Sequence, residues 1–187
     1  MQNSVSGSTD SNVFKLTSTG LLIAIGILIP MFIPGIRIEP ASYTLAVHVP
    51  IFIAMFISPK VAIGVVLGTT IGFQLSGFSL PVVFRAASHL IWALPGAIYL
   101  SKIDKLNLSG TRLRVFSLII ALIHGAGELT AVVLFYFGTS FPENQGLAWL
   151  FVFVGIGTVI HSMIDLEIAN IVRLALQRQR YFRMLMG

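Results

Sequence analysis

The residues of this sequence that could do chemistry are ionisable side chains inside long apolar segments. Arg85, His89 and Trp92 are spaced so that they share one face of a helix. The planar guanidinium of Arg85 suits a carboxylate or a phosphate, His89 can donate, accept or titrate, and Trp92 offers a flat wall to an aromatic ring. We interpret the three as a substrate pocket that opens to the outside of a membrane. The alternative is that Arg85 extends to the outer headgroups while the two rings only pack.

His124 and Glu128 form a second pair on one helix face, in a later apolar segment. A carboxylate near the middle of a bilayer is expected to be protonated or paired, and Arg85 is the best-placed charge partner. One interpretation is that Glu128 binds a polar group of the ligand. Another is that it joins two helices through Arg85 or His124, and a proton relay is a third.

His161 and Asp165 form a third such pair, expected near the cytoplasmic end of the last segment. Asp165 and Glu167 lie about 200° apart around a helix, so they cannot share a face. We expect both carboxylates at the interface, beside the arginines of the cytoplasmic rim, and we expect His161 to pack. Those arginines are Arg112, Arg114 and Arg173. Because the two His–carboxylate pairs are expected at different depths, we expect this chain to bind no metal and no cofactor.

Other polar residues lie near the outer ends of their segments. His48 and Gln74 could each line an outward pocket or make only an interhelical hydrogen bond. The outer loop that contains Arg37, Glu39 and Tyr43 could cover such a pocket as a lid, or could be an ordinary interfacial loop with an aromatic anchor.

The composition excludes most soluble classes of protein. The chain has 187 residues, of which 56% are apolar and 10% charged, whereas a soluble domain carries about 25% charged residues. It has no Cys, and therefore no disulfide, thiolate metal site or cysteine nucleophile. There is no P-loop or HExxH motif, and no Ser stands beside a His base on a shared face, so we expect a transport protein without catalytic residues.

The elements that must position these residues are helices, and we expect an all-α membrane protein with six transmembrane segments. They run over about 16–34, 42–58, 60–78, 80–100, 113–137 and 147–174. Pro59 interrupts an apolar run too long for one pass, and Gly77 with Pro81 separates the third segment from the fourth. Residues 1–14 are expected to be a disordered cytoplasmic N-terminus, and residues 15–187 one membrane domain.

The basic residues predict the orientation. With both termini in the cytoplasm, ten of the 12 Lys and Arg residues fall on that side, which leaves Arg37 outside and Arg85 within a segment. The net charge of +5 is therefore a sign of membrane topology and not of nucleic-acid binding.

Small residues mark two faces for close helix contact. Gly20 and Ala24 in the first segment could pack internally or dock a partner membrane subunit. The stripe formed by Gly64, Gly68 and Gly72 in the third segment is expected to pack internally.

Three stretches carry a family resemblance, namely LTSTGLLIAIGI, EPASYTLAVHVPIFIAMFISPKVAIGVVLGTTIGF and PVVFRAASHLIWALPGAIYL. From Lys15 onward the chain resembles the substrate-binding S components of energy-coupling factor (ECF) transporters. The first helix of that family shows an AxxxA motif that docks the coupling subunit. Here Gly20 replaces the first alanine and Ala24 holds the second.

The resemblance implies a bacterial cell-membrane subunit that binds a water-soluble vitamin near its outer face, beneath the first outer loop. It implies a coupling (T) subunit and two ATPase subunits as partners, which use the ATP. The second stretch looks most like members for small aromatic heterocycles: niacin, hydroxymethylpyrimidine or pyridoxine. Arg85 and Trp92 would suit niacin, provided that Glu128 does not neutralise Arg85, whereas His124 and Glu128 would suit the other two. The rival functions are a stand-alone proton-coupled transporter and, less favoured, a small membrane enzyme.

Overall fold

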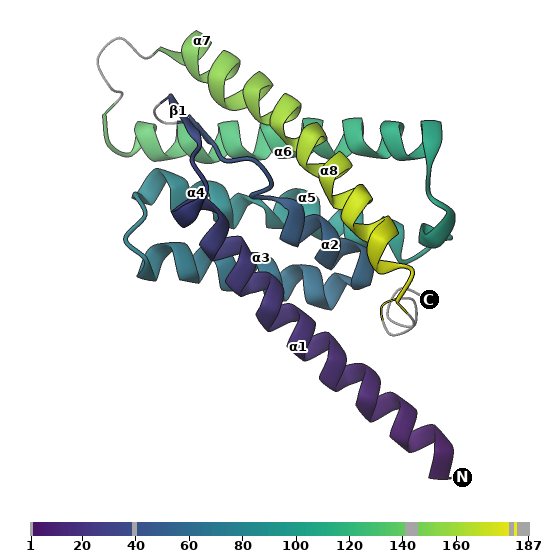
Figure 1. Ribbon diagram of the computed structural model, residues 1–187. Helices are drawn as coiled ribbons and strands as arrows, with labels where there is room; N and C mark the ends of the chain where they lie inside the picture. The colour runs from purple at the N-terminus through teal and green to yellow at the C-terminus, as the bar shows by residue number, and fades with distance from the viewer. Residues whose placement is uncertain (1, 39–40, 141–145, 180–181, 183–187) are drawn as a thin grey trace.

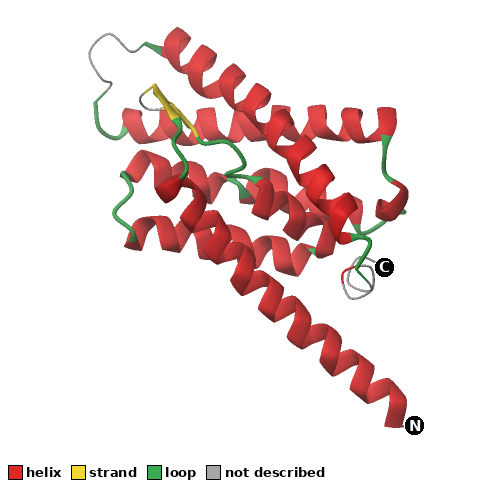
Figure 2. Cartoon of the chain, viewed as in Figure 1, coloured by secondary structure: helices red, strands yellow, loops and turns green. Residues whose placement is uncertain are grey.

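The structure is a computed structural model that describes residues 2–38, 41–140, 146–179 and 182 (Figure 1). Helices dominate it and the strands form only a small hairpin, which confirms the expected all-α class (Figure 2). The helices are α1 (Gln2–Phe32), α2 (Val49–Ile57), α3 (Pro59–Leu75), α4 (Leu80–Ser88), α5 (Leu90–Leu100), α6 (Gly110–Phe137), α7 (Leu147–Leu150) and α8 (Gly157–Leu176). The shorter elements are the antiparallel strands β1 (Ile36–Ile38) and β2 (Ala41–Tyr43), the 3₁₀ turn η1 (Lys105–Asn107) and the π-helical turn η2 (Phe151–Ile156).

Four helical stretches are long and apolar enough to cross a membrane, counted over the described part of the chain. They are Asn12–Phe32, Leu80–Leu100, Gly110–Phe137 and Leu147–Leu176. Upstream of the first of them, α1 already begins at Gln2, so the structure gives helix where we expected disorder over residues 2–14. The division of the chain into a tail (1–14) and a membrane domain (15–187) stays a prediction.

The expected full-length second segment over residues 42–58 is wrong. Its first residues belong to β2 and to a turn in which Ala46 has a left-handed φ of 67°. Only the nine residues of α2 are helical, and Pro50 lies in the first turn, where its missing N–H is not needed. Every residue from Pro50 to Ile57 is buried. Hydropathy alone does not distinguish such a short core helix from a membrane span.

The fourth segment is interrupted at His89, which separates α4 from α5. At this position the His89 N–H donates to the carbonyl of Ala86, three residues back. The Trp92 N–H donates to the carbonyl of His89, also three residues back. Pro95, inside α5, cannot donate to the carbonyl of Ile91 and loosens the helix on its N-terminal side. The break places the imidazole of His89 at a helix junction in the protein interior.

The expected internal role of the third-segment glycines is confirmed. A methyl group added to Gly64 would lie 3.0 Å from Thr19 of α1, and methyl groups at Gly68 and Gly72 would overlap Ile23 and Ile27. Side chains of α1 therefore occupy the space left by the glycines of α3, in the close contact that small residues allow between membrane helices.

The elements define two opposite ends of the molecule (Figure 1). The hairpin end contains β1 and β2, the turn between α3 and α4, and the end of α6. The basic end contains the start of α3, the α5–α6 connection, the last turn of α8 and the N-terminus. The basic residues of these basic-end elements are Lys60, Lys102, Lys105, Arg112, Arg114, Arg173 and Arg178.

Arg173 differs from expectation, because it is buried and does not pair with Asp165. Its guanidinium donates to the carbonyls of Lys105 (2.7 Å) and Leu108 (2.9 Å), and lies 4.9 Å from the ring centre of Phe56. Arg173 thereby holds the α5–α6 connection against α2 and α8.

Candidate functional site

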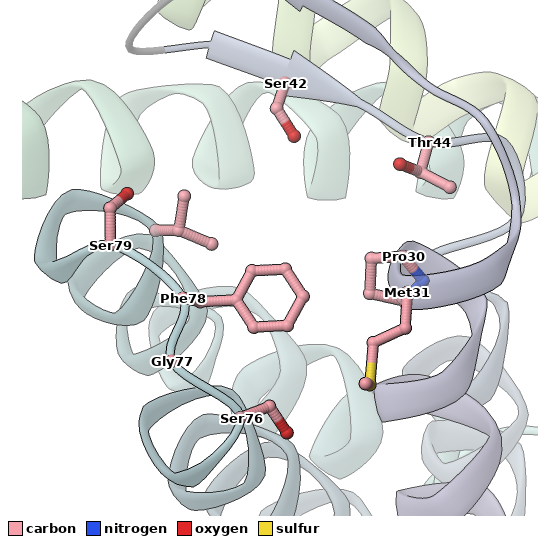
Figure 3. Close-up of a pocket in the computed structure, with 9 residues that line it drawn as sticks. Pro30, Met31, Ser42, Thr44, Ser76, Gly77, Phe78 and Ser79 are labelled. Carbon is pink, nitrogen blue, oxygen red and sulfur yellow. The ribbon is translucent and has the colours of Figure 1, made fainter.

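A cavity of about 430 Å³ lies at the hairpin end, between the last turn of α1, strand β2 and the α3–α4 turn. Figure 3 shows the hydroxyl groups of Ser42 and Thr44 and the ring of Phe78 directed into this space, with Pro30 and Met31 opposite. The cavity combines hydroxyl groups with one aromatic face. Such a lining suits a small polar molecule with a flat ring.

A smaller cavity of about 50 Å³ continues from the first toward the protein interior. The two share several lining residues, namely Pro30, Ser42, Thr44, Phe78 and Val82. Phe73 and four polar side chains complete the inner wall: His48, Arg85, His89 and Glu128. The route from the hairpin end therefore leads to a charged cluster.

Glu128 of α6 is the centre of this cluster and is 1% exposed. Its Oε2 accepts from Arg85 Nη2 at 2.8 Å, from Arg85 Nε at 3.1 Å and from the Thr158 hydroxyl at 2.7 Å. Its Oε1 lies 3.1 Å from His89 Nε2 and 3.3 Å from His124 Nε2. The interhelical Arg85–Glu128 pair that we considered from the sequence is present, so Glu128 neutralises Arg85 in this structure. That removes the condition under which the sequence favoured niacin.

Asp165 of α8 is buried beside the first residues of α2, and the expectation that it pairs with arginines at the interface is wrong. Its Oδ1 accepts from the Ala46 N–H at 2.8 Å, and its Oδ2 accepts from the N–H and the ring Nδ1 of His48, both at 3.0 Å. His161 Nε2 lies 3.3 Å from the same Oδ2. Glu167 is exposed.

All four histidines of the chain meet in one group, with His48 in the middle. The ring centre of His48 lies 4.6 Å from that of His124, 4.9 Å from that of His89 and 5.1 Å from that of His161. The two His–carboxylate pairs that we expected at different depths are therefore joined through His48.

The remaining candidate pocket residues lie away from the cavity. Trp92 and His124 are fully buried and packed against each other, with ring centres 4.7 Å apart, behind the residues of the cavity wall. Gln74 is exposed, and it is its neighbour Phe73 that lines the inner cavity. Contact of these three residues with a ligand stays a prediction.

The loop expected to act as a lid is the β1–β2 hairpin. Arg37 lies in β1 opposite Ser42, and Glu39 lies outside the described residues. Alternation along β2 places Ser42 and Thr44 on the cavity side and Tyr43 on the other. Tyr43 instead approaches His161, with ring centres 5.5 Å apart, and its hydroxyl lies close to Gly157.

Sequence reasoning missed Ser42, Thr44, Phe73 and Phe78 as wall residues. The alternation of side chains along a strand could have identified Ser42 and Thr44. The apolar run that follows Tyr43 instead led us to expect a helix there. Phe73 and Phe78 flank a turn, and their rings stack with centres 4.7 Å apart.

The candidate docking residues lie on a face that the described part of the chain leaves uncovered. Gly20 and Ala24 are both exposed, and a methyl group added to Gly20 would meet no atom within 4 Å. The face is separate from the one that α1 packs on the glycines of α3.

Comparison with known proteins finds a relative of known transport activity. The chain is 37% identical over 162 residues to the niacin transporter NiaX of Lactococcus lactis subsp. cremoris. The aligned region covers 85% of this chain and 72% of that protein. No family model matches the chain. No solved structure matches it either.

Proposed function

The chain belongs to the family of vitamin transporters that includes NiaX, and from this premise we propose that it is the substrate-binding S component of an ECF-type importer. It is a multi-pass protein of the cell membrane, in keeping with that family and with its apolar helices. In this role the chain captures a small water-soluble vitamin from outside. A transporter relative supports this role over that of a membrane enzyme.

The substrate we propose is niacin, ahead of hydroxymethylpyrimidine and pyridoxine. The observation that carries this proposal is the 37% identity to the niacin transporter NiaX, because the Arg85–Glu128 pair weakens the argument from charge alone. Arg85 lies on the wall of a cavity that also presents Phe78 and two hydroxyl groups, which supports the proposal. A carboxylate binds a guanidinium through charge-assisted hydrogen bonds, and a pyridine ring packs against an aromatic face. Glu128 holds Arg85 in a fixed position at the base of the cavity, so the guanidinium is already oriented before the ligand enters.

The proposed topology has six segments, with both termini and the basic end in the cytoplasm. The two shorter helices, α2 and α3, provide the second and third passes, and the hairpin supplies the part of the second pass that α2 leaves uncovered. The hairpin end then faces outside, and the hairpin that contains Arg37 and Tyr43 is the proposed lid. The clustering of basic residues at the elements of one end supports this orientation.

The proposed partners are a coupling (T) subunit and two ATPase subunits, which hydrolyse the ATP. The exposed Gly20 and Ala24 on α1 support a docking face for the coupling subunit, because small residues let two helix backbones approach closely.

The test is calorimetric titration of the purified chain in detergent with niacin, nicotinamide, pyridoxine, hydroxymethylpyrimidine and pantothenate. We expect niacin to bind tightest, and nicotinamide to bind about ten- to a hundredfold more weakly, because it lacks the charge that Arg85 recognises. Arg85→Ala should weaken niacin binding and leave nicotinamide binding nearly unchanged.

Arg114→Ala is the matched control, since Arg114 is exposed at the basic end. If Arg85→Ala leaves the tightest ligand unaffected, the proposed site is wrong. The niacin–nicotinamide comparison on the unchanged chain tests the charge recognition even if the variant does not fold. Proton-driven niacin uptake by vesicles that contain this chain alone would contradict the S-component role.

A further inference from the structure

We propose that His48, His89, His124 and Glu128 bind a divalent first-row transition metal ion, such as Zn²⁺, at the base of the cavity. Each of the four offers one ligand atom, these atoms all lie within 4.8 Å of one another, and all four residues are buried. This site goes beyond the proposed function, since niacin recognition through Arg85 does not require it.

The spacing is somewhat wider than that of a loaded site. Ligand atoms 2.0–2.2 Å from a tetrahedral Zn²⁺ lie about 3.3–3.6 Å apart, so a pair at the limit of 4.8 Å has to approach by up to about 1.5 Å. Rotations of side chains supply this movement, because the four residues come from three separate elements. His48 precedes α2, His89 lies between α4 and α5, and His124 and Glu128 share one face of α6.

The outer partners already orient the ligands. His48 Nδ1 donates to Asp165 Oδ2 at 3.0 Å, which leaves the lone pair of a neutral imidazole on Nε2. His124 Nδ1 lies 3.1 Å from the Ser162 hydroxyl, so its Nε2 faces the cluster. Metal-binding histidines nearly always have the other ring nitrogen held in this way.

The carboxylate of Glu128 is also oriented by its hydrogen-bond partners. Arg85 and Thr158 both bind its Oε2, whereas its Oε1 is the atom directed at His89 and His124. A metal ion would replace the contacts of Oε1 with these two imidazoles by bonds to a shared centre. Among the described side chains of the cluster, the carboxylates of Glu128 and Asp165 outnumber the one guanidinium, that of Arg85, which favours an added cation.

An independent observation points to a ligand at this position. His124 is fully buried, and its Nε2, although 3.3 Å from Glu128 Oε1, makes no hydrogen bond of good geometry in the part of the chain that the structure describes. A buried imidazole nitrogen without a hydrogen bond costs about 1–3 kcal/mol, so native proteins rarely leave one unsatisfied. A metal bond to Nε2 satisfies it.

The ligand chemistry selects the class of ion. Three imidazoles and one carboxylate suit Zn²⁺, Co²⁺ or Ni²⁺, whereas Mg²⁺ and Ca²⁺ prefer oxygen ligands. Ligand histidines bind through a deprotonated ring nitrogen, which is the form described above for His48.

The experiment uses the full chain in detergent, with any polyhistidine tag removed and chelator dialysed away. Titration with Co²⁺ should produce the intense visible absorption of a four-coordinate ion at one equivalent, and Zn²⁺ should displace it. His124→Gln should abolish the absorption. His161→Gln, which changes a buried histidine outside the ligand set, should retain it, and Ser162→Ala should weaken Zn²⁺ binding by about 10–100-fold.

The proposal is overturned if Co²⁺ gives no such spectrum with the unchanged chain, or if His161→Gln abolishes binding while His124→Gln does not. Ser162→Ala keeps the test valid if His124→Gln does not fold, since unchanged Zn²⁺ affinity in that variant would also contradict the site. The metal titration is run without niacin, and niacin binding is measured with and without chelator. Failure of the metal site is thus distinguishable from failure of the niacin site.

Discussion

Asp165 and His48 are 117 residues apart in the chain, yet the carboxylate of one accepts two hydrogen bonds of 3.0 Å from the other. The same carboxylate accepts from the N–H of Ala46, whose left-handed backbone costs about 1–2 kcal/mol for a residue with a side chain. Asp165 therefore fixes the turn that starts α2, and with it the position of His48 in the cavity wall. A residue of the last helix thus controls the inner wall of the cavity.

Replacing Asp165 by Asn should destabilise the chain by about 3 kcal/mol, because one carboxylate oxygen that accepts from His48 becomes an NH₂ group. Thermal unfolding in detergent measures the change. Glu167→Gln is the matched control, since Glu167 is an exposed carboxylate two residues along the same helix, and should change stability by less than about 0.5 kcal/mol. Equal effects of the two substitutions would contradict the role of Asp165.

The failure of sequence reasoning at Asp165 has a geometric cause. Depth was counted from the ends of apolar segments, and this count assumed a full-length second segment. The nine residues of α2 span only about 14 Å, so in the proposed topology His48 lies about halfway through a bilayer of about 30 Å. Asp165 stands 11 residues before the end of α8, or about 17 Å, at nearly the same depth.

Other parts were predictable because they depend on local signals. Pro59 was expected to separate two helices and does so, and the glycine stripe of α3 packs internally as its spacing indicated. The Arg85–Glu128 pair could be anticipated because buried charges need partners. The meeting of all four histidines could not, since periodicity along a helix does not say which distant segment packs against it. The vitamin-transporter resemblance is confirmed by the 37% identity to NiaX.

Filling the cavity should block ligand binding without unfolding the protein. Ser42 lies on the cavity side of β2, and its hydroxyl points into the open space (Figure 3), so Ser42→Trp places an indole where the ligand would bind. We expect niacin affinity to fall at least about tenfold in calorimetry, with little change in the unfolding temperature. Leu75→Trp is the control, because Leu75 is 81% exposed. Undiminished niacin binding by Ser42→Trp would place the ligand elsewhere.

A bulky residue on the exposed face of α1 should prevent assembly and leave the chain folded. Gly20 and Ala24 are exposed in the described part of the chain, so we expect Gly20→Trp and Ala24→Trp to leave thermal stability and niacin affinity unchanged, with loss of co-purifying ATPase subunits. Leu21→Trp adds similar bulk one residue away on another face and should retain those subunits. Retention by all three variants would contradict the docking face.

The close approach of Tyr43 to Gly157 links the hairpin to the start of α8. A methyl group at Gly157 would overlap the Tyr43 hydroxyl, whereas one at Gly155 would lie 3.5 Å from Leu129, which is ordinary contact. We therefore expect Gly157→Ala to displace the hairpin and to lower stability by about 1–3 kcal/mol, while Gly155→Ala should be neutral or slightly stabilising.

The combination of Gly157→Ala with Tyr43→Leu should restore part of the loss, because the shorter side chain leaves room for the methyl group. Thermal unfolding and niacin titration of the two single variants and the double variant form a cycle that measures the coupling. Additive effects would mean that Tyr43 does not depend on the space at Gly157. If the coupling appears in niacin affinity as well as in stability, the contact between Tyr43 and Gly157 determines the position of the hairpin.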